Sequence, residues 1–246
     1  MNMLLDQPPP SEGDSAMDLD QLISQGGTAD KKIGVLIGHN LGSNTLLVKV
    51  PMHEFYEMSE VANERGLQNR ADLEGEEVAQ RSLDPKHAQK LAVYILKGLA
   101  NALNNKHRRE GRAVPPALER IQRVLGRQPY LALQPITTNI RTCAFGGKGL
   151  RIEAGGDGLV NVFISAKDVL WVVDGQHRRY AMQMLFDYLR ALTSTYRYPK
   201  RPPLYSVDGD GKIDSEELRV WMELFGIART TCTVMVEVHL GLTADQ

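Results

Sequence analysis

The sequence predicts a mixed α/β fold, and three observations lead to this prediction. Aliphatic runs with the character of strands occur at residues 33–38, 45–51 and 169–173. Elsewhere, apolar residues recur at spacings of three and four, as they do in amphipathic helices. The chain has 246 residues, 42% of them hydrophobic, which is enough to bury a substantial core. We therefore expect a mixed sheet with flanking helices.

The first half of the chain predicts a hairpin and two helices. His-Asn and Gly-Ser separate the runs 33–38 and 45–51, so these runs should pair as a hairpin. Residues 53–66 have mixed polarity and predict a short helix. The best-defined helix should begin at Pro85, because Asp84 is placed to cap it and proline suits the first helical position. Its apolar residues recur at helical spacing, at Leu91, Ala92, Ile95 and Leu99.

Polar and glycine-rich segments alternate in the middle of the chain. Residues 104–128 are polar and basic, which predicts a loop with one short helix after Pro115-Pro116. Residues 130–145 predict a strand that is interrupted or ended near Pro135. Residues 146–164 predict a hairpin with a glycine-rich connection. The glycine spacing there is a weak sign of a phosphate loop, because no helical pattern follows it.

The charges are unevenly distributed although the net charge is −1. Residues 1–30 contain six acids and no Lys or Arg, so residues 1–32 are predicted to be a disordered acidic tail before a single domain at 33–246. Residues 65–127 contain 13 Lys or Arg and seven acids. This basic stretch is either a solvated helical surface or a surface that faces nucleic acid.

Composition also limits where the protein is expected to act. No apolar run approaches the roughly 18 residues of a membrane helix, and the N-terminus lacks the pattern of a secretory signal. We therefore predict a cytoplasmic protein that does not contact a membrane. Cys143 and Cys232 are expected to be free thiols, because they are widely spaced in a chain with no export signal.

The segment "VLWVVDGQHRRYAMQML", residues 169–185, contains the strongest functional signal. A continuous apolar run predicts a strand buried on both faces, and a sharp turn at Asp174-Gly175 leads into an amphipathic helix. The start of a helix favours an anion, Gly175 lets a ligand approach the backbone, and Arg178 and Arg179 add positive charge. The apolar stripe of this helix consists of Ala181, Met184, Leu185, Tyr188, Leu189 and Leu192. This arrangement predicts a phosphate site.

Each residue of this turn also has a purely structural interpretation. Asp174 can cap the helix, and Gly175 can simply satisfy a turn. His177 can donate to a backbone carbonyl, and Arg179 can be a surface residue. Gln176 offers a donor and an acceptor to a base or a sugar. Taken together, the strand, the turn and the clustered cations favour the anion site.

Asp174-Gly175-Gln176-His177-Arg178 resembles the signature of the DGQHR-domain family, which includes DndB-like proteins of bacterial DNA phosphorothioation and phage defence. "AQRSLDPKHAQKLAVYI" (79–95) is similar to the segment and helix that precede the motif in that family. "TVMVEVHLGLTADQ" resembles the strand that follows it. The resemblance implies a ParB/sulfiredoxin-like mixed sheet with flanking helices. It also implies a nucleotide-phosphate pocket at the turn, with Gln80 and Arg81 as partners.

Two functions of different classes follow from this resemblance. In the first, the protein is a nucleotide-binding component of a DNA-modification or defence system, with the catalytic candidates Asp174, His177 and Arg178. It would bind ATP or another nucleoside triphosphate with magnesium, and hydrolysis of the bound nucleotide would be a further step. Gly175, Gln176 and Arg179 would line the site. In the second, it is a non-catalytic DNA-binding regulator. DNA and other proteins of the system are the expected partners in both.

Two further activities of the superfamily are disfavoured. The sulfiredoxin reaction needs a thiolate nucleophile, and Gln176 stands where that thiol would be. A ParB-like nuclease is the weaker reading, because no cluster of metal-ligand residues accompanies the motif.

An insertion at 200–226 departs from the family pattern and is similar to an EF-hand loop. Asp208, Asp210 and Glu217 match ligand positions 3, 5 and 12, and Gly211 matches the glycine at position 6. Ser206 stands where the first ligand is normally Asp, so any calcium binding should be weak. The alternative is an acidic turn that caps a helix starting near Ser215.

Overall fold

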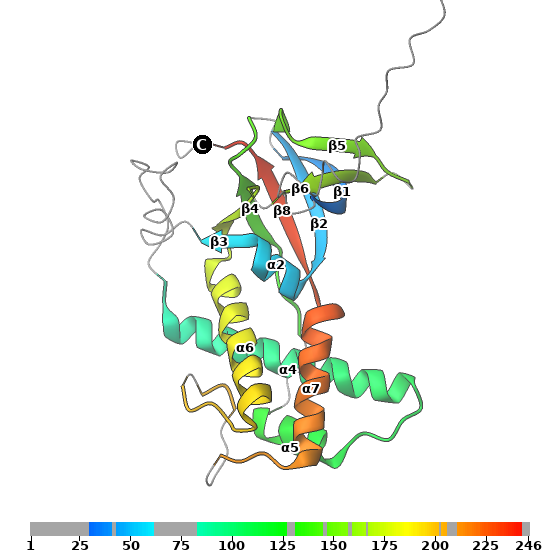
Figure 1. Cartoon of the computed structure of the whole chain (residues 1–246), viewed down its shortest axis with the longest axis vertical. Coiled ribbons are helices and arrows are strands. Elements are labelled where there is room, and N and C mark those ends of the chain that lie inside the picture. Colours follow the sequence, from blue (N-terminus) through cyan, green and yellow to red (C-terminus); the bar gives the residue numbers. More distant parts are fainter. Residues whose placement is uncertain are drawn as a thin grey trace, which may run out of the picture.

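A computed structural model describes residues 30–40, 43–61, 83–126, 131–144, 147–156, 159–165, 167–201, 203–205 and 211–242. Eight strands form one mixed sheet in the order β3-β7-β4-β8-β2-β1-β6-β5 (Figure 1). The strands are β1 (Lys31–Asn40), β2 (Ser43–Pro51), β3 (Ser59–Val61), β4 (Ile136–Ile140), β5 (Arg151–Ala154), β6 (Val160–Ile164), β7 (Leu170–Asp174) and β8 (Thr233–Leu240). The predicted α+β class, a mixed sheet with flanking helices, is confirmed.

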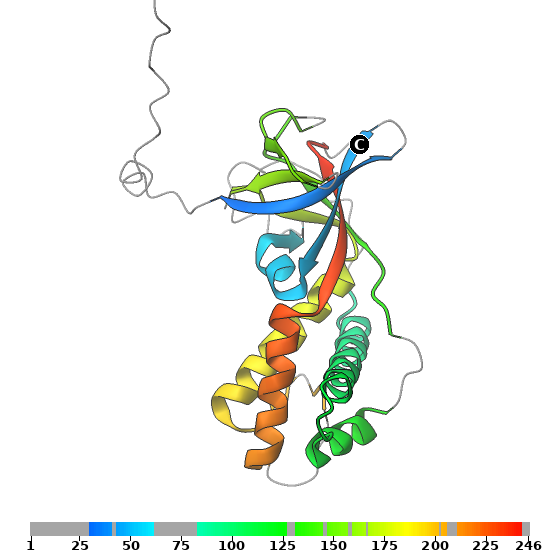
Figure 2. The same ribbon diagram turned by 90° about the vertical axis from the view of Figure 1, so that its right-hand side faces the viewer.

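Helices extend from one end of this sheet. They are α2 (Met52–Met58), α4 (Pro85–Arg109), α5 (Pro116–Leu125), α6 (Gln176–Thr195) and α7 (Ser215–Thr230). Helix α4 packs against α6, and both contact α7, while α5 lies against the C-terminal half of α4. Figure 2 shows α6 and α7 descending from the strands with α4 beside them. Among the described helices, none has the length and apolar character needed to cross a bilayer.

Most of the elements lie where the sequence predicts them. Strands β1 and β2 form the first hairpin, with Val35 opposite Val48, and β5 and β6 form the glycine-rich one. The strand predicted to be interrupted or ended near Pro135 instead begins directly after this residue, as β4, because proline has no N–H to donate to the sheet. Asp84 caps α4 by accepting hydrogen bonds from the N–H groups of Lys86 and His87.

The prediction of a loop from residue 104 was wrong at its start, because α4 continues to Arg109. Two polar residues of this extension have partners on neighbouring helices. The Asn104 amide donates to Gln122 of α5, and buried His107 lies 3.2 Å from the carboxylate of Glu223 in α7. These contacts between helices allow a polar segment to pack as helix rather than to remain a loop.

The segment 53–66 also differs from its prediction. Helix α2 ends at Met58, and the three residues of β3 follow it and pair in parallel with β7. This pairing covers the edge of β7 that β4 does not occupy, so β7 has neighbours on both sides. Its first three residues, Leu170, Trp171 and Val172, are buried, whereas Val173 and Asp174 are exposed. The strand is therefore buried only until it approaches the turn.

An aromatic cluster joins Tyr198 and Tyr205 to α7. Trp221 is fully buried, and its indole N–H donates to the Tyr198 hydroxyl at 3.1 Å. Tyr205 packs against both rings, and Tyr188 of α6 meets Trp221 edge-on. Burial raises the pKa values of Tyr188 and Tyr198 well above the ordinary range, and raises the pKa of Tyr205 to about 12, with Glu217 adding to the effect.

This cluster predicts a loss of stability at alkaline pH. The unfolded chain releases its tyrosine protons near pH 10, whereas folded Tyr205 keeps its proton until about pH 12. The stabilisation is therefore complete below pH 10 and declines as the pH rises toward 12. Replacing Tyr205→Phe should make the fall of the melting midpoint between pH 10 and about pH 12 shallower than in the wild type. Exposed Tyr196→Phe is the control and should not change this slope.

Candidate functional site

The candidate site is the turn between β7 and α6. Asp174 ends the strand, Gly175 has the left-handed conformation (φ 95°, ψ 20°), and Gln176 begins the helix. Asp174 pairs with Thr137 of β4 at a point where the register shifts, which is an irregularity of the kind found beside functional sites. The sequence prediction of a sharp strand-to-helix turn is confirmed.

The guanidinium of Arg178 folds back across this turn. One terminal nitrogen donates to the carbonyl oxygen of Pro135 and the other to the carboxylate of Asp174, each at 2.7 Å. A Cβ atom on Gly175 would lie 2.9 Å from the same guanidinium, so glycine is needed for space as well as for conformation. The Arg178 side chain is 15% exposed, so its position is set by the protein. These bonds use two of its five N–H donors.

Asp174 does not cap α6, so the interpretation of Asp174 as a helix cap was wrong. Gly175 occupies the cap position, and no side chain accepts a hydrogen bond there. The Asp174 side chain is instead 77% exposed and paired with Arg178. An exposed carboxylate therefore stands beside a helix start whose first turn contains no acidic residue.

His177 joins the start of α6 to the start of α4. Its Nε2 atom accepts a hydrogen bond of 2.9 Å from the backbone N–H of Asp84, the cap residue of α4. An accepting Nε2 carries no proton, so the ring in this state is the neutral Nδ1–H tautomer. The ring of His87 lies edge-on to that of His177, with 5.1 Å between centroids. His177 thus accepts from an N–H group, whereas the structural interpretation had it donating to a carbonyl.

The N-termini of α4 and α6 consequently meet at one place. Both carry the partial positive charge of a helix start. The environment of Asp84 reflects this, because its pKa is held below the ordinary value mainly by the N–H of His87, with a smaller contribution from the N–H of Lys86. Two helix starts and the Arg178 guanidinium therefore favour negative charge at this junction.

Arg179 points away from the junction. Its guanidinium donates to the carbonyl oxygens of Tyr56 and Ser59, at 3.3 and 2.8 Å, and to Gln183. It also lies 4.7 Å from the centre of the Tyr56 ring, and burial lowers its pKa. Arg179 is therefore not a surface residue; it ties α6 to the segment from α2 to β3.

The remaining predicted residues are only partly described. Gln176 is the half-buried first residue of α6. Gln80, Arg81, Asp208 and Asp210 lie outside the described residues, so their roles stay predictions. Glu217 lies beside the Tyr198 and Tyr205 hydroxyls. Helix α7 begins at Ser215, as predicted, and Asp214 caps it by accepting from the Glu217 N–H.

Sequence reasoning missed three partners of the junction. Asp84 was predicted only as a cap, and neither His87 nor Pro135 was connected with the motif. Asp84 and His177 are 93 positions apart, and Pro135 and Arg178 are 43 apart. A local pattern carries no information about such pairs. The only available signal was that a capped helix start contained a histidine, His87.

The strand, the glycine turn and the helix start thus define an α+β protein whose turn is held by the Arg178 guanidinium. The family described as DNA-sulfur modification-associated, DndB, matches residues 33–244. The match covers the sheet, the helices and the turn, and the chain belongs to this family. Comparison with curated proteins and with solved structures gives no match.

The geometry of Gly175 generates a direct prediction. Gly175→Ala should lower the free energy of unfolding by about 1–3 kcal/mol, because alanine is strained at this φ and its Cβ collides with Arg178. The measurement is equilibrium unfolding in urea. Gly226→Ala in α7 is the control: nothing lies within 4 Å of its added Cβ, so stability should stay equal or rise. Equal effects of both substitutions would contradict the geometry of the turn.

Calcium binding at the EF-hand-like segment stays a prediction. Gly211 has φ 74°, which suits the sharp turn at the sixth position of such a loop. The backbone of Lys212 forms an isolated antiparallel β-bridge with that of Arg197. If calcium binds, millimolar calcium should raise the melting midpoint of the wild type but not of Asp208→Asn, since ligand binding stabilises the native state. Magnesium at the same concentration is the control. An equal midpoint with and without calcium would leave this segment without a metal role.

Proposed function

We propose that the junction of α4 and α6 binds the phosphate groups of a nucleoside triphosphate, and that the protein performs this step within a DNA sulfur-modification system. The observation that carries the proposal is the hydrogen bond from the Asp84 N–H to His177. It brings two helix starts together, and the Arg178 guanidinium lies across the turn from which α6 begins. Such a concentration of oriented N–H dipoles and positive charge suits phosphate oxygens.

Asp174 supplies the carboxylate that a magnesium nucleotide needs. Magnesium is commonly bound through one or two carboxylates together with substrate phosphates, rather than by a cage of protein ligands. Among the described residues no group of three or more His, Cys, Asp or Glu side chains is arranged to hold a metal. A single exposed carboxylate beside the phosphate position fits the first arrangement, and magnesium held there would neutralise phosphate charge.

The proposed chemistry is hydrolysis of a phosphate anhydride. Water attacks the terminal phosphorus, and negative charge is carried by the phosphoryl and leaving oxygens. Arg178 and the backbone N–H groups at the start of α6 would stabilise this charge, and they are already fixed in place. His177 and Gly175 would keep the junction in register, while Arg179 holds α6 against the sheet.

Arg178→Ala should abolish binding of magnesium ATP, CTP or GTP in calorimetric titration. The substitution removes the fixed guanidinium at the turn while α6 retains its apolar face. Because Arg178 also bonds to Pro135, the circular dichroism spectrum and the melting curve are needed to show that the variant is folded. Arg190→Ala is the matched control. Arg190 lies on the same helix, its side chain is 58% exposed, and it forms an exposed ion pair with Asp187, three residues earlier.

Release of phosphate on whichever nucleotide binds separates binding from hydrolysis. Asp174→Asn should bind nucleotide but release phosphate much more slowly, because the carboxylate for magnesium is lost. Unchanged affinity in folded Arg178→Ala would contradict the phosphate role of the turn. Binding without phosphate release in the wild type would leave a nucleotide-binding protein that is not an enzyme.

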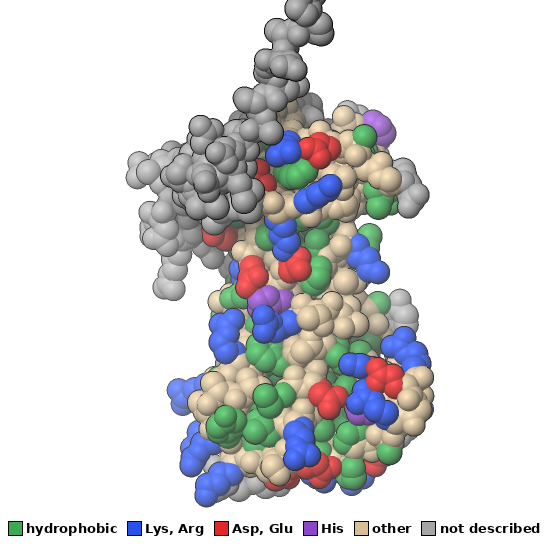
Figure 3. Space-filling model, turned by 45° about the vertical axis from the view of Figure 1, so that its right-hand side comes forward, with side chains coloured by type: hydrophobic (Ala, Val, Ile, Leu, Met, Phe, Trp, Pro, Cys, Tyr) green, Lys and Arg blue, Asp and Glu red, His purple; other side chains and the backbone are tan. Residues whose placement is uncertain are grey.

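A second candidate is a non-catalytic DNA-binding regulator of the same system. It is favoured by the nine Lys or Arg and three acids in residues 83–126, which form α4, α5 and their connection. Figure 3 shows Lys and Arg side chains along the rim of the helical end of the molecule. A strong dependence of DNA affinity on salt, without nucleotide turnover, would support this candidate.

A further inference from the structure

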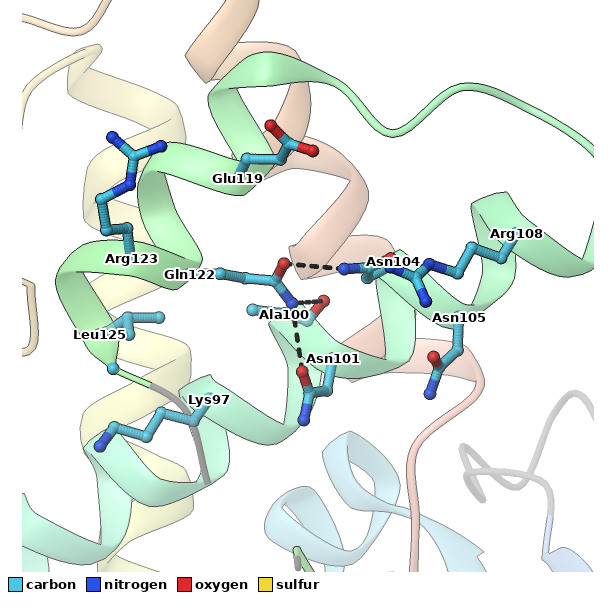
Figure 4. A pocket seen from close by; sticks show the side chains of 11 residues that line it. Lys97, Ala100, Asn101, Asn104, Asn105, Arg108, Glu119, Gln122, Arg123 and Leu125 are labelled. Atoms are coloured by element: carbon cyan, nitrogen blue, oxygen red, sulfur yellow. Dashed lines mark hydrogen bonds between the residues drawn. The ribbon is translucent and has the colours of Figure 1, made fainter. Parts of the chain in front are cut away.

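A groove of about 810 Å³ lies between α4 and α5, away from the turn. Its cations are Lys97 and Arg108 of α4 and Arg123 of α5, and Glu119 is the one acid in its lining. The remaining polar lining consists of the carboxamides of Asn101, Asn104, Asn105 and Gln122. Figure 4 shows Lys97 and Arg123 on one side of Gln122, and Arg108 on the other.

The floor of the groove is fixed by hydrogen bonds. Gln122 accepts from the Asn104 amide at 2.8 Å and donates to the Ala100 carbonyl and to the Asn101 side-chain oxygen, at 3.3 and 3.1 Å (Figure 4). Because its oxygen faces Gln122, Asn101 turns its amide nitrogen, a donor, the other way. The groove therefore presents cations and an oriented amide donor over a rigid base.

The spacing of the cations selects an extended ligand over a compact one. Lys97 and Arg108 are 11 positions apart on one helix, which corresponds to about 16 Å along its axis. The third cation, Arg123, comes from the opposite helix. A single phosphate group would call for converging donors, whereas charges distributed along a groove suit a chain of phosphates.

We propose that this groove binds the phosphodiester backbone of duplex DNA without reading its sequence, an inference that rests on the second candidate function and names its surface. Lysine, arginine and amide side chains are the usual partners of phosphate oxygens. Proteins that prefer single strands stack the bases on aromatic side chains, and the described lining of this groove contains none. The site is independent of nucleotide binding at the turn: Lys97 lies 13 positions after Asp84 on the α4 helix, about 20 Å along its axis.

The test measures the affinity of the full chain for two labelled 20-base-pair duplexes of unrelated sequence between about 50 and 200 mM KCl, by fluorescence anisotropy. Lys97→Gln, Arg108→Gln and Arg123→Gln should each reduce the slope of log K against log salt by about 0.9, equally for both duplexes. The triple variant should lose about three times as much. Matching melting curves would show that each variant is folded.

The triple variant Lys49→Gln, Lys167→Gln and Arg229→Gln is the charge-matched control, because these residues are exposed and lie outside the groove, on β2, between β6 and β7, and on α7. This control should keep the wild-type slope. A wild-type slope in the folded triple variant, no binding of duplex by the wild type, or tighter binding of single-stranded DNA would each overturn the proposal.

Failure here is distinguishable from failure at the turn. The triple variant should bind magnesium ATP as the wild type does, and Arg178→Ala should keep the wild-type salt slope for duplex. Displacement of the duplex by millimolar ATP in Arg178→Ala would show that the groove takes free nucleotides, and would overturn its assignment to DNA.

Discussion

The hydrogen bond between the backbone N–H of Asp84 and Nε2 of His177 is the contact on which the site depends. It joins the starts of α4 and α6, two helices that pack against each other. Without this bond, the relative position of the two helix starts would be set by side-chain packing between α4 and α6 alone. The neutral, accepting histidine is therefore a structural element of the anion-favouring junction.

The sheet provides the second constraint. Strand β7 lies between β3 and β4, and Arg178 reaches back to the carbonyl of Pro135, directly before β4. Arg179 anchors the same helix to the carbonyls of Tyr56 and Ser59 near β3. Two adjacent arginines thus attach α6 to both neighbours of β7. The turn is held from each side, and the proposed binding of phosphate requires such a fixed arrangement.

Local patterns in the sequence predicted the elements well where one residue type decides the structure. Pro85 and Asp84 located the start of α4, and Asp174-Gly175 located the turn. Sequence reasoning failed where a residue distant in the chain determines the local structure. Asn104 and His107 look like loop residues until Gln122 and Glu223 supply their hydrogen bonds. The inward direction of Arg179 likewise depends on Tyr56, which is 123 positions away.

Helix α4 connects the two proposed sites, because its first turn belongs to the junction and its later turns form one wall of the groove. The same helix could therefore bring a nucleotide and DNA onto one rigid element in a protein of the DNA-sulfur modification-associated family. This arrangement gives the two ligands separate surfaces and makes their effects separable by mutation.

The most direct test of the junction is a two-dimensional amide NMR titration of the labelled protein with magnesium ATP. The account predicts that the largest shifts occur together at Gly175–Arg178 and at Asp84–His87, the two helix starts. Shifts concentrated at residues of the α4–α5 groove, with both helix starts unchanged, would contradict it.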